Sequence, residues 1–133
     1  MITVVGTFLW YNDKFLIIQR HPDKPQGGTW GLPAGKVDAE ESDENAAMRE
    51  LQEETGVVVS SVKYMSEIDY QHEGQKPIRF VSFESRVEQE PDITIRPEEI
   101  LSYRWITAKE CFELQNTIPG FQEVLIACKY IVV

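Results

Sequence analysis

Residues Gly35–Val57 read GKVDAEESDENAAMRELQEETGV, and this stretch carries the strongest signal in the chain. It has the pattern G-x5-E-x7-R-E-U-x-E-E-x-G-U, in which U is a bulky aliphatic residue. The specified positions are Gly35, Glu41, Arg49, Glu50, Leu51, Glu53, Glu54, Gly56 and Val57. At average residue frequencies, a chance match at one starting position is on the order of one in a billion. The stretch is therefore a motif rather than a consequence of composition.

The middle of the motif predicts a helix with an acidic patch. Residues Ser42–Thr55 contain no proline or glycine, and Ser42 is a suitable N-cap. On this helix Glu50, Glu53 and Glu54 lie at positions i, i+3 and i+4, so their carboxylates crowd onto one side. Like charges at this spacing repel, but a hard divalent cation reverses that cost because magnesium and manganese prefer oxygen ligands. A bare glutamate-rich helix is usually only a solvated face, and the surrounding motif argues against that interpretation here.

The same stretch resembles the box of the Nudix hydrolases at every specified position. Members of that family hydrolyse nucleoside diphosphates linked to a further group, and they use divalent metal ions. The resemblance implies the Nudix fold, a curved mixed β-sheet sandwiched between α-helices, in the α/β (α+β) class. It also implies a single Nudix hydrolase domain over residues 1–133, with the box at residues 35–57.

The resemblance implies a role for each charged box residue. Gly35 would contribute its carbonyl to a metal, and Glu50 and Glu54 match the glutamates that most often ligate it. Glu53 would be a further ligand or the catalytic base that deprotonates the attacking water. Arg49 would orient a box glutamate through a charge-assisted hydrogen bond. The implied cofactor is Mg²⁺, with Mn²⁺ as the alternative.

Candidates outside the box come from similarity to MutT-type members. Glu99 precedes Trp105 closely, and it is a candidate base or supporting ligand, or else a solvated loop acid. Arg20 aligns with an arginine that contacts substrate, although a basic residue at a strand end is often only solvated. Gln122, with Phe121 as its neighbour, falls where a polar residue reads the purine edge. An exposed helix position is the competing interpretation for Gln122.

The composition favours a small enzyme over a nucleic-acid binder. The chain has 133 residues and a formal net charge of −9, which argues against binding long nucleic acid. Its apolar start, ITVVGTFLWY, is too short for a membrane span and lacks the features of a signal peptide. Cys111 and Cys128 show no metal or disulfide spacing, so we expect reduced thiols and a cytoplasmic protein. A small-molecule nucleotide is the expected partner, with no membrane partner, in a monomer or homodimer.

Hydrophobic patterning and turn signals predict the remaining elements. The expected strands are Ile2–Tyr11, Lys14–Gln19, Thr29–Pro33, Lys36–Val37, part of Val57–Tyr70, Ile78–Val87 and Tyr103–Ile106. Turns are expected at Asn12-Asp13, at residues 33–35 and at Gln71–Lys76, the last containing His72. The T-x-x-E spacing of Thr107 and Glu110 predicts a helix to about Gln115, and a last helix is expected to begin near Pro119 and to run through Phe121–Lys129.

Aromatic side chains provide candidates for a base-stacking pocket. They are Phe8, Trp30, Tyr70 and Phe80. Most aromatic residues at strand spacing belong to the core, so we expect at least half of these four to be core residues.

The motif indicates the reaction but not the substrate. No coenzyme A motif precedes the box and no marker of ADP-ribose enzymes follows it, so the best match is a compact MutT-like enzyme. Such an enzyme would convert a (deoxy)nucleoside triphosphate to the monophosphate and pyrophosphate. Gly31 and Ala34 depart from the usual residues at their positions. Alternative substrates are a nucleotide sugar, ADP-ribose, a dinucleoside polyphosphate or an RNA 5′ end, and the alternative of another class is a non-catalytic nucleotide-binding sensor.

Overall fold

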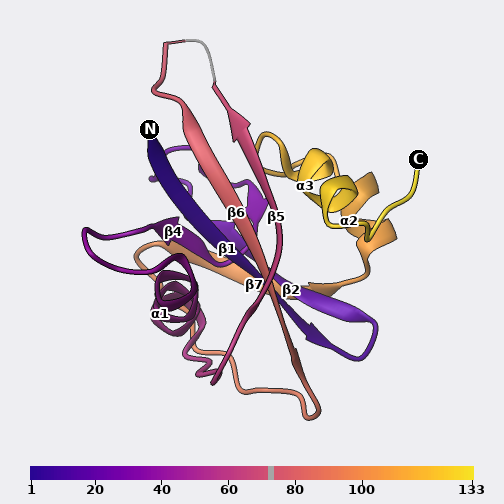
Figure 1. Cartoon of the computed structure of the whole chain (residues 1–133). Helices are drawn as coiled ribbons and strands as arrows, with labels where there is room; N and C mark the ends of the chain where they lie inside the picture. Colours follow the sequence, from indigo (N-terminus) through magenta and orange to yellow (C-terminus); the bar gives the residue numbers. More distant parts are fainter. Residues whose placement is uncertain (72–73) are drawn as a thin grey trace.

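The computed structural model describes residues 1–71 and 74–133, which form a sheet flanked by helices (Figure 1). The elements in chain order are β1 Ile2–Tyr11, β2 Lys14–Arg20, β3 Trp30–Gly31, β4 Ala34–Lys36, α1 Asp43–Thr55, β5 Lys63–Tyr70, β6 Ile78–Val87, β7 Ile100–Ile106, α2 Ala108–Glu113 and α3 Phe121–Ala127. His72 and the tip of the turn expected around it lie outside the described residues.

The strands form one mixed sheet. β1 runs parallel to β6 along its whole length, whereas β2 returns antiparallel to β1 after the turn at Asn12. Asn12 has a φ of 56°, a left-handed conformation that asparagine tolerates. β5 pairs with β6, β4 pairs with β1, and β3 and β7 both pair with β2. The expected mixed sheet with helices, of the α/β (α+β) class, is confirmed.

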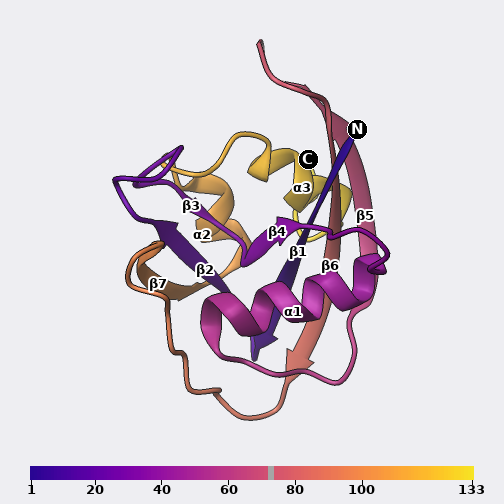
Figure 2. The ribbon, with the colours of Figure 1, turned by 90° about the vertical axis from the view of Figure 1, so that its left-hand side faces the viewer.

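The sheet separates two helical layers. Figure 2 shows α1 on one side of the strands and α2 and α3 on the other. Successive side chains of a strand point to opposite faces, so β1 contributes to both layers. Val5 and Leu9 belong to the clusters that include α1 residues, whereas Phe8 and Trp10 belong to the cluster that includes α2 and α3 residues. β1 is therefore the central element on which both helical layers rest.

Helix α1 begins and ends where the local sequence predicts. The Ser42 hydroxyl accepts a hydrogen bond from the Asn45 backbone N–H at 3.1 Å, which satisfies one free donor of the first turn. Gly56 has a φ of 76°, a left-handed conformation that costs glycine little, and its N–H donates to the Gln52 carbonyl. The helix expected over Ser42–Thr55 is thus confirmed, with Ser42 as its cap.

The turn expected at residues 33–35 is wrong. Ala34–Lys36 form strand β4, in which Ala34 pairs with Gly6 and Gly35 with Val5. Proline, alanine and glycine in sequence are typical of a turn, but the free edge of β1 offers backbone partners that override this local preference. As a result, the strand expected at Thr29–Pro33 is reduced to β3, and β4 replaces the one expected at Lys36–Val37.

Several other elements differ from expectation at their ends. β5 begins at Lys63, well inside the expected range, and β7 begins at Ile100, three residues before Tyr103. The capping box of Thr107 and Glu110 is confirmed, but α2 ends at Glu113. α3 ends at Ala127 and is preceded by Gly120.

The two cysteines, Cys111 and Cys128, are free and buried, as expected of reduced thiols. Among residues 1–71 and 74–133, no helix combines the length and apolarity needed to cross a bilayer.

We predict that replacing Leu51 weakens the attachment of α1 to the sheet. Its side chain is fully buried and clusters with Leu9, Leu16 and Val57. Leu51→Ala removes this packing and leaves a cavity, so the free energy of unfolding in urea should fall by about 2–5 kcal/mol. Gln52→Ala, at the exposed neighbouring position, should change it by no more than about 0.5 kcal/mol. Equal effects of the two changes would contradict this packing.

Candidate active site

Strand β4 and helix α1 approach each other closely enough to fix two glutamates beside the sheet. A Cβ atom added to Gly35 would lie 2.2 Å from the carboxyl carbon of Glu50, so no other residue fits there without displacing that glutamate. One turn further on, the Glu54 carboxylate accepts a hydrogen bond from the Ala34 backbone N–H at 2.6 Å. Because β4 is held in place by its pairing with β1, these two contacts fix the positions of the Glu50 and Glu54 carboxylates relative to the sheet.

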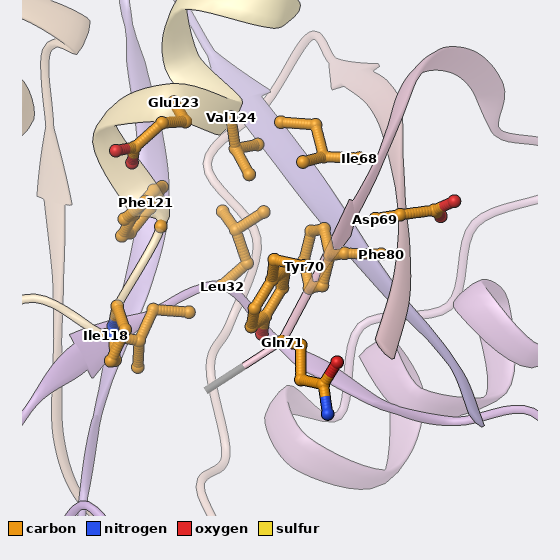
Figure 3. Close-up of a pocket in the computed structure, with 12 residues that line it drawn as sticks. Leu32, Ile68, Asp69, Tyr70, Gln71, Phe80, Ile118, Phe121, Glu123 and Val124 are labelled. Carbon is orange, nitrogen blue, oxygen red and sulfur yellow. The ribbon is translucent and has the colours of Figure 1, made fainter. Parts of the chain in front are cut away.

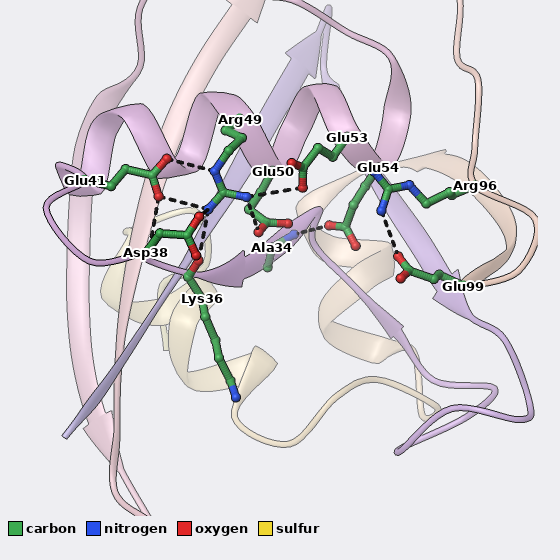
Figure 4. A network of polar contacts seen from close by, with 10 residues as sticks. All are labelled: Ala34, Lys36, Asp38, Glu41, Arg49, Glu50, Glu53, Glu54, Arg96 and Glu99. Atoms are coloured by element: carbon green, nitrogen blue, oxygen red, sulfur yellow. Dashed lines mark hydrogen bonds and ion pairs between the residues drawn. The ribbon is translucent and has the colours of Figure 1, made fainter.

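Arg49 binds several acidic side chains of the box at once (Figure 4). Its guanidinium donates to both carboxylate oxygens of Glu41, at 2.8 and 2.9 Å, and to the Lys36 carbonyl at 3.1 Å. It also donates to Glu50 at 2.9 Å and to Glu53 at 3.2 Å. A planar group with five N–H donors can serve this many acceptors at once, and lysine cannot. Arg49 therefore orients both Glu50 and Glu53.

The carboxylates of the site differ in their pKa values. The hydrogen bond from Arg49 lowers the pKa of Glu41 to about 2. Burial raises the pKa of Glu50 despite its bond to Arg49. Burial also raises the pKa of Glu54 to about 8, against the effect of the Ala34 hydrogen bond and with a contribution from the nearby Glu50. Negative charge at Glu54 is therefore costly unless a cation compensates it.

Glu50 and Glu54 line a cavity of about 390 Å³ between β4, α1, β2 and the start of β7. Gly35, Arg20 and Glu99 line it as well, so the structure brings these five predicted site residues together. The Arg20 guanidinium donates to the Pro25 carbonyl at 2.9 Å, and Glu99 forms an ion pair of 3.5 Å with Arg96. The residues come from four separate parts of the chain.

Four of the nine predicted site residues are absent from the cavity wall: Arg49, whose contacts are given above, and Glu53, Phe121 and Gln122. Glu53 is not part of the cavity wall, and its side chain, 39% exposed, lies on the outer side of α1 beside Arg49. Gln122 donates to the Phe112 carbonyl at 2.7 Å and so links α3 to α2. Phe121 is 2% exposed and packs near Phe8 and Phe15, with one edge lining a second, apolar pocket.

The aromatic candidates divide between core and pocket. Phe8 is fully buried and Trp30 packs against the core under Arg104, whereas Tyr70 and Phe80 line both pockets. Phe80, 5% exposed, also belongs to the core cluster. The expectation that at least half of the four are core residues is confirmed.

Two lysines that the sequence does not single out as site residues also line the cavity. Lys24 lies in the loop after β2, and Lys36 ends β4. Nothing in their local patterns separates them from ordinary surface lysines, because only the return of the chain places them beside the glutamates.

The residues present fit a hard divalent cation. Among residues 1–71 and 74–133, no three acidic, histidine or cysteine side chains form a complete metal cage. Magnesium does not need one, because it commonly takes one or two carboxylates and completes its shell with waters and substrate phosphates. Glu50 and Glu54 supply two such carboxylates at a position where burial disfavours their charge. The tight contact of Gly35 with the Glu50 carboxylate places the Gly35 backbone directly beside that group.

Comparison with known proteins identifies the family. The NUDIX domain model matches residues 2–127, so this chain belongs to the Nudix family. A MutT protein from Methanosarcina mazei Go1 has the same fold, with a TM-score of 0.86 and 21% identity over 96% of this chain and 92% of that one. The expected Nudix fold and MutT-like architecture are confirmed.

Two relatives carry names that indicate different substrates. Over 66 residues the chain is 36% identical to a CTP pyrophosphohydrolase of Escherichia coli (strain K12), a match covering 50% of this chain and 49% of the relative. The chain thus spans about half the length of that relative. It is 27% identical to an RNA pyrophosphohydrolase of Erythrobacter litoralis (strain HTCC2594), over 90% of this chain and 82% of the relative.

We predict that metal-free protein loses stability as the pH rises. The folded-state pKa of Glu54 is raised to about 8 from an ordinary value of 4.5, so the folded state binds more protons than the unfolded state between these values. The contribution of Glu54 to stability is therefore present below about pH 4.5 and lost as the pH rises through about 8. Unfolding in EDTA should show this fall, and Glu54→Gln should flatten it.

The exposed Glu44→Gln on the same helix is the matched control and should keep the wild-type pH dependence. An unchanged slope in Glu54→Gln would show that this carboxyl is not the group responsible.

Proposed function

We propose that this protein hydrolyses a phosphoric anhydride bond, and that its substrate is a (deoxy)nucleoside triphosphate cleaved to the monophosphate and pyrophosphate. The observation that carries the proposal is the junction of two pockets. Leu32, Tyr70, Phe80 and Ile118 line both the charged cavity and the apolar pocket, so the two adjoin. A nucleotide has the same division, with an apolar base face at one end and phosphates at the other.

The charged cavity suits the phosphates. Arg20 of β2, Lys24 of the loop after it and Lys36 at the end of β4 supply positive charge to the cavity wall. Arginine and lysine both bind phosphate oxygens, arginine through a planar fork and lysine as a point charge. The three cations would hold the polyphosphate chain against α1, where the carboxylates lie. The relative named as a CTP pyrophosphohydrolase supports a triphosphate as the substrate.

We propose Mg²⁺ as the cofactor, with Mn²⁺ as the alternative, held by Glu50, Glu54 and the Gly35 carbonyl. When bound, such an ion neutralises the phosphate charge and lowers the pKa of a coordinated water. Arg49 keeps Glu50 oriented and its charge compensated. Glu53, held by Arg49 at the outer side of α1, is the proposed proton acceptor for the attacking water, and Glu99, which lines the cavity, is the second candidate.

A substrate panel with magnesium and mass analysis of every product tests this proposal. It contains canonical and oxidised (d)NTPs, ADP-ribose, nucleotide sugars, dinucleoside polyphosphates and a triphosphorylated RNA. We expect monophosphate and pyrophosphate from the triphosphates. Turnover of only a sugar-linked or dinucleoside-linked diphosphate would make that compound the substrate in place of the triphosphate. Binding without any turnover would favour a nucleotide sensor.

We predict that Glu53→Gln lowers kcat for the best substrate by about 10²–10⁴-fold, since positioned proton transfer contributes that much. The mutant keeps the hydrogen-bond acceptor toward Arg49 but cannot take a proton. Glu99→Gln is measured alongside, and the larger loss identifies the base. Glu44→Gln is the control and should retain wild-type kcat. If neither Glu53→Gln nor Glu99→Gln lowers kcat, both assignments are wrong.

We predict that Lys24→Gln raises KM for a triphosphate several-fold with little change in kcat. The side chain lies in the loop on the phosphate side of the cavity, outside the group of carboxylates, so its charge should aid binding more than the chemical step. Lys109→Gln, a charge change on α2 away from both pockets, should leave KM unchanged. The same KM for both variants would remove Lys24 from the phosphate site.

A further inference from the structure

The apolar pocket has a volume of about 360 Å³ and is called here the base slot. Figure 3 shows the Leu32, Phe80 and Tyr70 side chains gathered opposite Ile118 and Phe121. The remaining wall residues are Ile68, Asp69, Gln71, Pro119, Gly120, Glu123 and Val124. The slot therefore offers an incoming ring mostly carbon surface.

The charged and amide side chains of the slot point away from its centre. On β5, Ile68 and Tyr70 face the slot, and the alternation of a strand directs Asp69 to the opposite face. The Gln71 amide donates to the Gln75 carbonyl at 2.9 Å. Glu123 is exposed, and Figure 3 shows its carboxylate turned away from Leu32 and Tyr70. These three side chains form the rim of the slot rather than its interior.

The backbone around the slot is largely committed to internal hydrogen bonds. The Ile118 N–H donates to the Trp30 carbonyl at 2.8 Å, and the Phe121 N–H donates to the Ile118 carbonyl at 3.3 Å. The Gly120 carbonyl accepts from the Val124 N–H at 3.1 Å, and Pro119 has no N–H. Tyr70 is paired with Ile78 across the ladder of β5 and β6.

The side-chain amide of Gln122, at the start of α3, also forms its hydrogen bond outside the slot. Gln122 would be the natural group on α3 to pair with a base edge, because an amide offers both a donor and an acceptor. Its Nε2 instead donates to the Phe112 carbonyl at 2.7 Å, on the side of α3 that faces α2. It lines a neighbouring groove that shares residues 118–121 and Glu123 with the base slot, but it is itself absent from the wall of the slot.

We infer that the base slot holds a nucleobase by apolar contact and does not read its edge, so that the protein discriminates weakly among the four bases. This inference rests on the proposed nucleotide substrate. Every base has an apolar face, so stacking and apolar packing tolerate all of them. Strong rejection of a wrong base needs buried polar groups that it leaves unpaired. Among the described side chains that face the slot, the Tyr70 hydroxyl is the one such group, and the others are apolar. The protein instead selects its ligands by their phosphates, which would bind Arg20, Lys24 and Lys36 in the charged cavity.

Calorimetric binding of non-hydrolysable α,β-imido analogues of ATP, GTP, CTP and UTP, with magnesium, tests the inference. We expect the four Kd values to agree within about 10-fold, because apolar pockets discriminate only weakly between similar ligands. Inorganic triphosphate, the base-free probe, should bind at least about 10-fold more weakly. A preference above 100-fold for one base, equal binding of inorganic triphosphate, or no binding of any analogue would overturn the inference.

Three variants test the mechanism. Ile118→Ala should weaken all four analogues by a similar factor, and Ile126→Ala, on the exposed face of α3, should weaken none. Tyr70→Phe should leave the order of the four Kd values unchanged, whereas a new order would reveal edge readout by the hydroxyl. Thermal melts establish that each variant is folded.

The binding assay separates this inference from the proposed function. Similar Kd values for the four analogues without hydrolysis of any triphosphate would support the slot and reject the enzyme activity. Hydrolysis of triphosphates with a preference above 100-fold for one base would support the activity and reject the slot.

Discussion

The guanidinium of Arg49 is the contact on which the acidic site depends. It bonds to Glu41, Glu50 and Glu53 and to the Lys36 carbonyl, and so joins helix α1 to the loop before it and to strand β4. Without this cation, the acidic side chains would repel one another on one side of the helix. The site therefore keeps several carboxylates close together because one of its own residues compensates part of their charge, while Glu54 remains uncompensated by any arginine hydrogen bond in the described chain.

The close approach of β4 to α1 explains why a glycine stands at position 35. A larger residue there would collide with the Glu50 carboxylate, and pairing with β1 prevents β4 from moving away. The same pairing explains why the turn expected from Pro33-Ala34-Gly35 does not form. A local pattern reports only what a short segment prefers by itself, and here the unpaired edge of β1 outweighs that preference.

The predictable parts of the site are those fixed by local geometry. The spacing of Glu50, Glu53 and Glu54 defines one side of a helix, and Ser42 and Gly56 mark its ends. The sequence could not show that Glu53 lies outside the cavity wall, since that depends on how α1 rotates against the sheet. Lys24 and Gln122 depend in the same way on where distant segments return, so their surroundings follow from tertiary packing alone.

The net charge of −9 describes the chain but not the cavity. Glu50, Glu54 and Glu99 line the same cavity as Arg20, Lys24 and Lys36, so its side-chain charges are balanced when all six are ionised. Burial favours the neutral form of Glu54, which moves that balance toward positive charge. A polyphosphate in this cavity would therefore meet an attractive local field on an acidic protein. The distribution of charge, rather than its sum, makes an anionic substrate compatible with this chain.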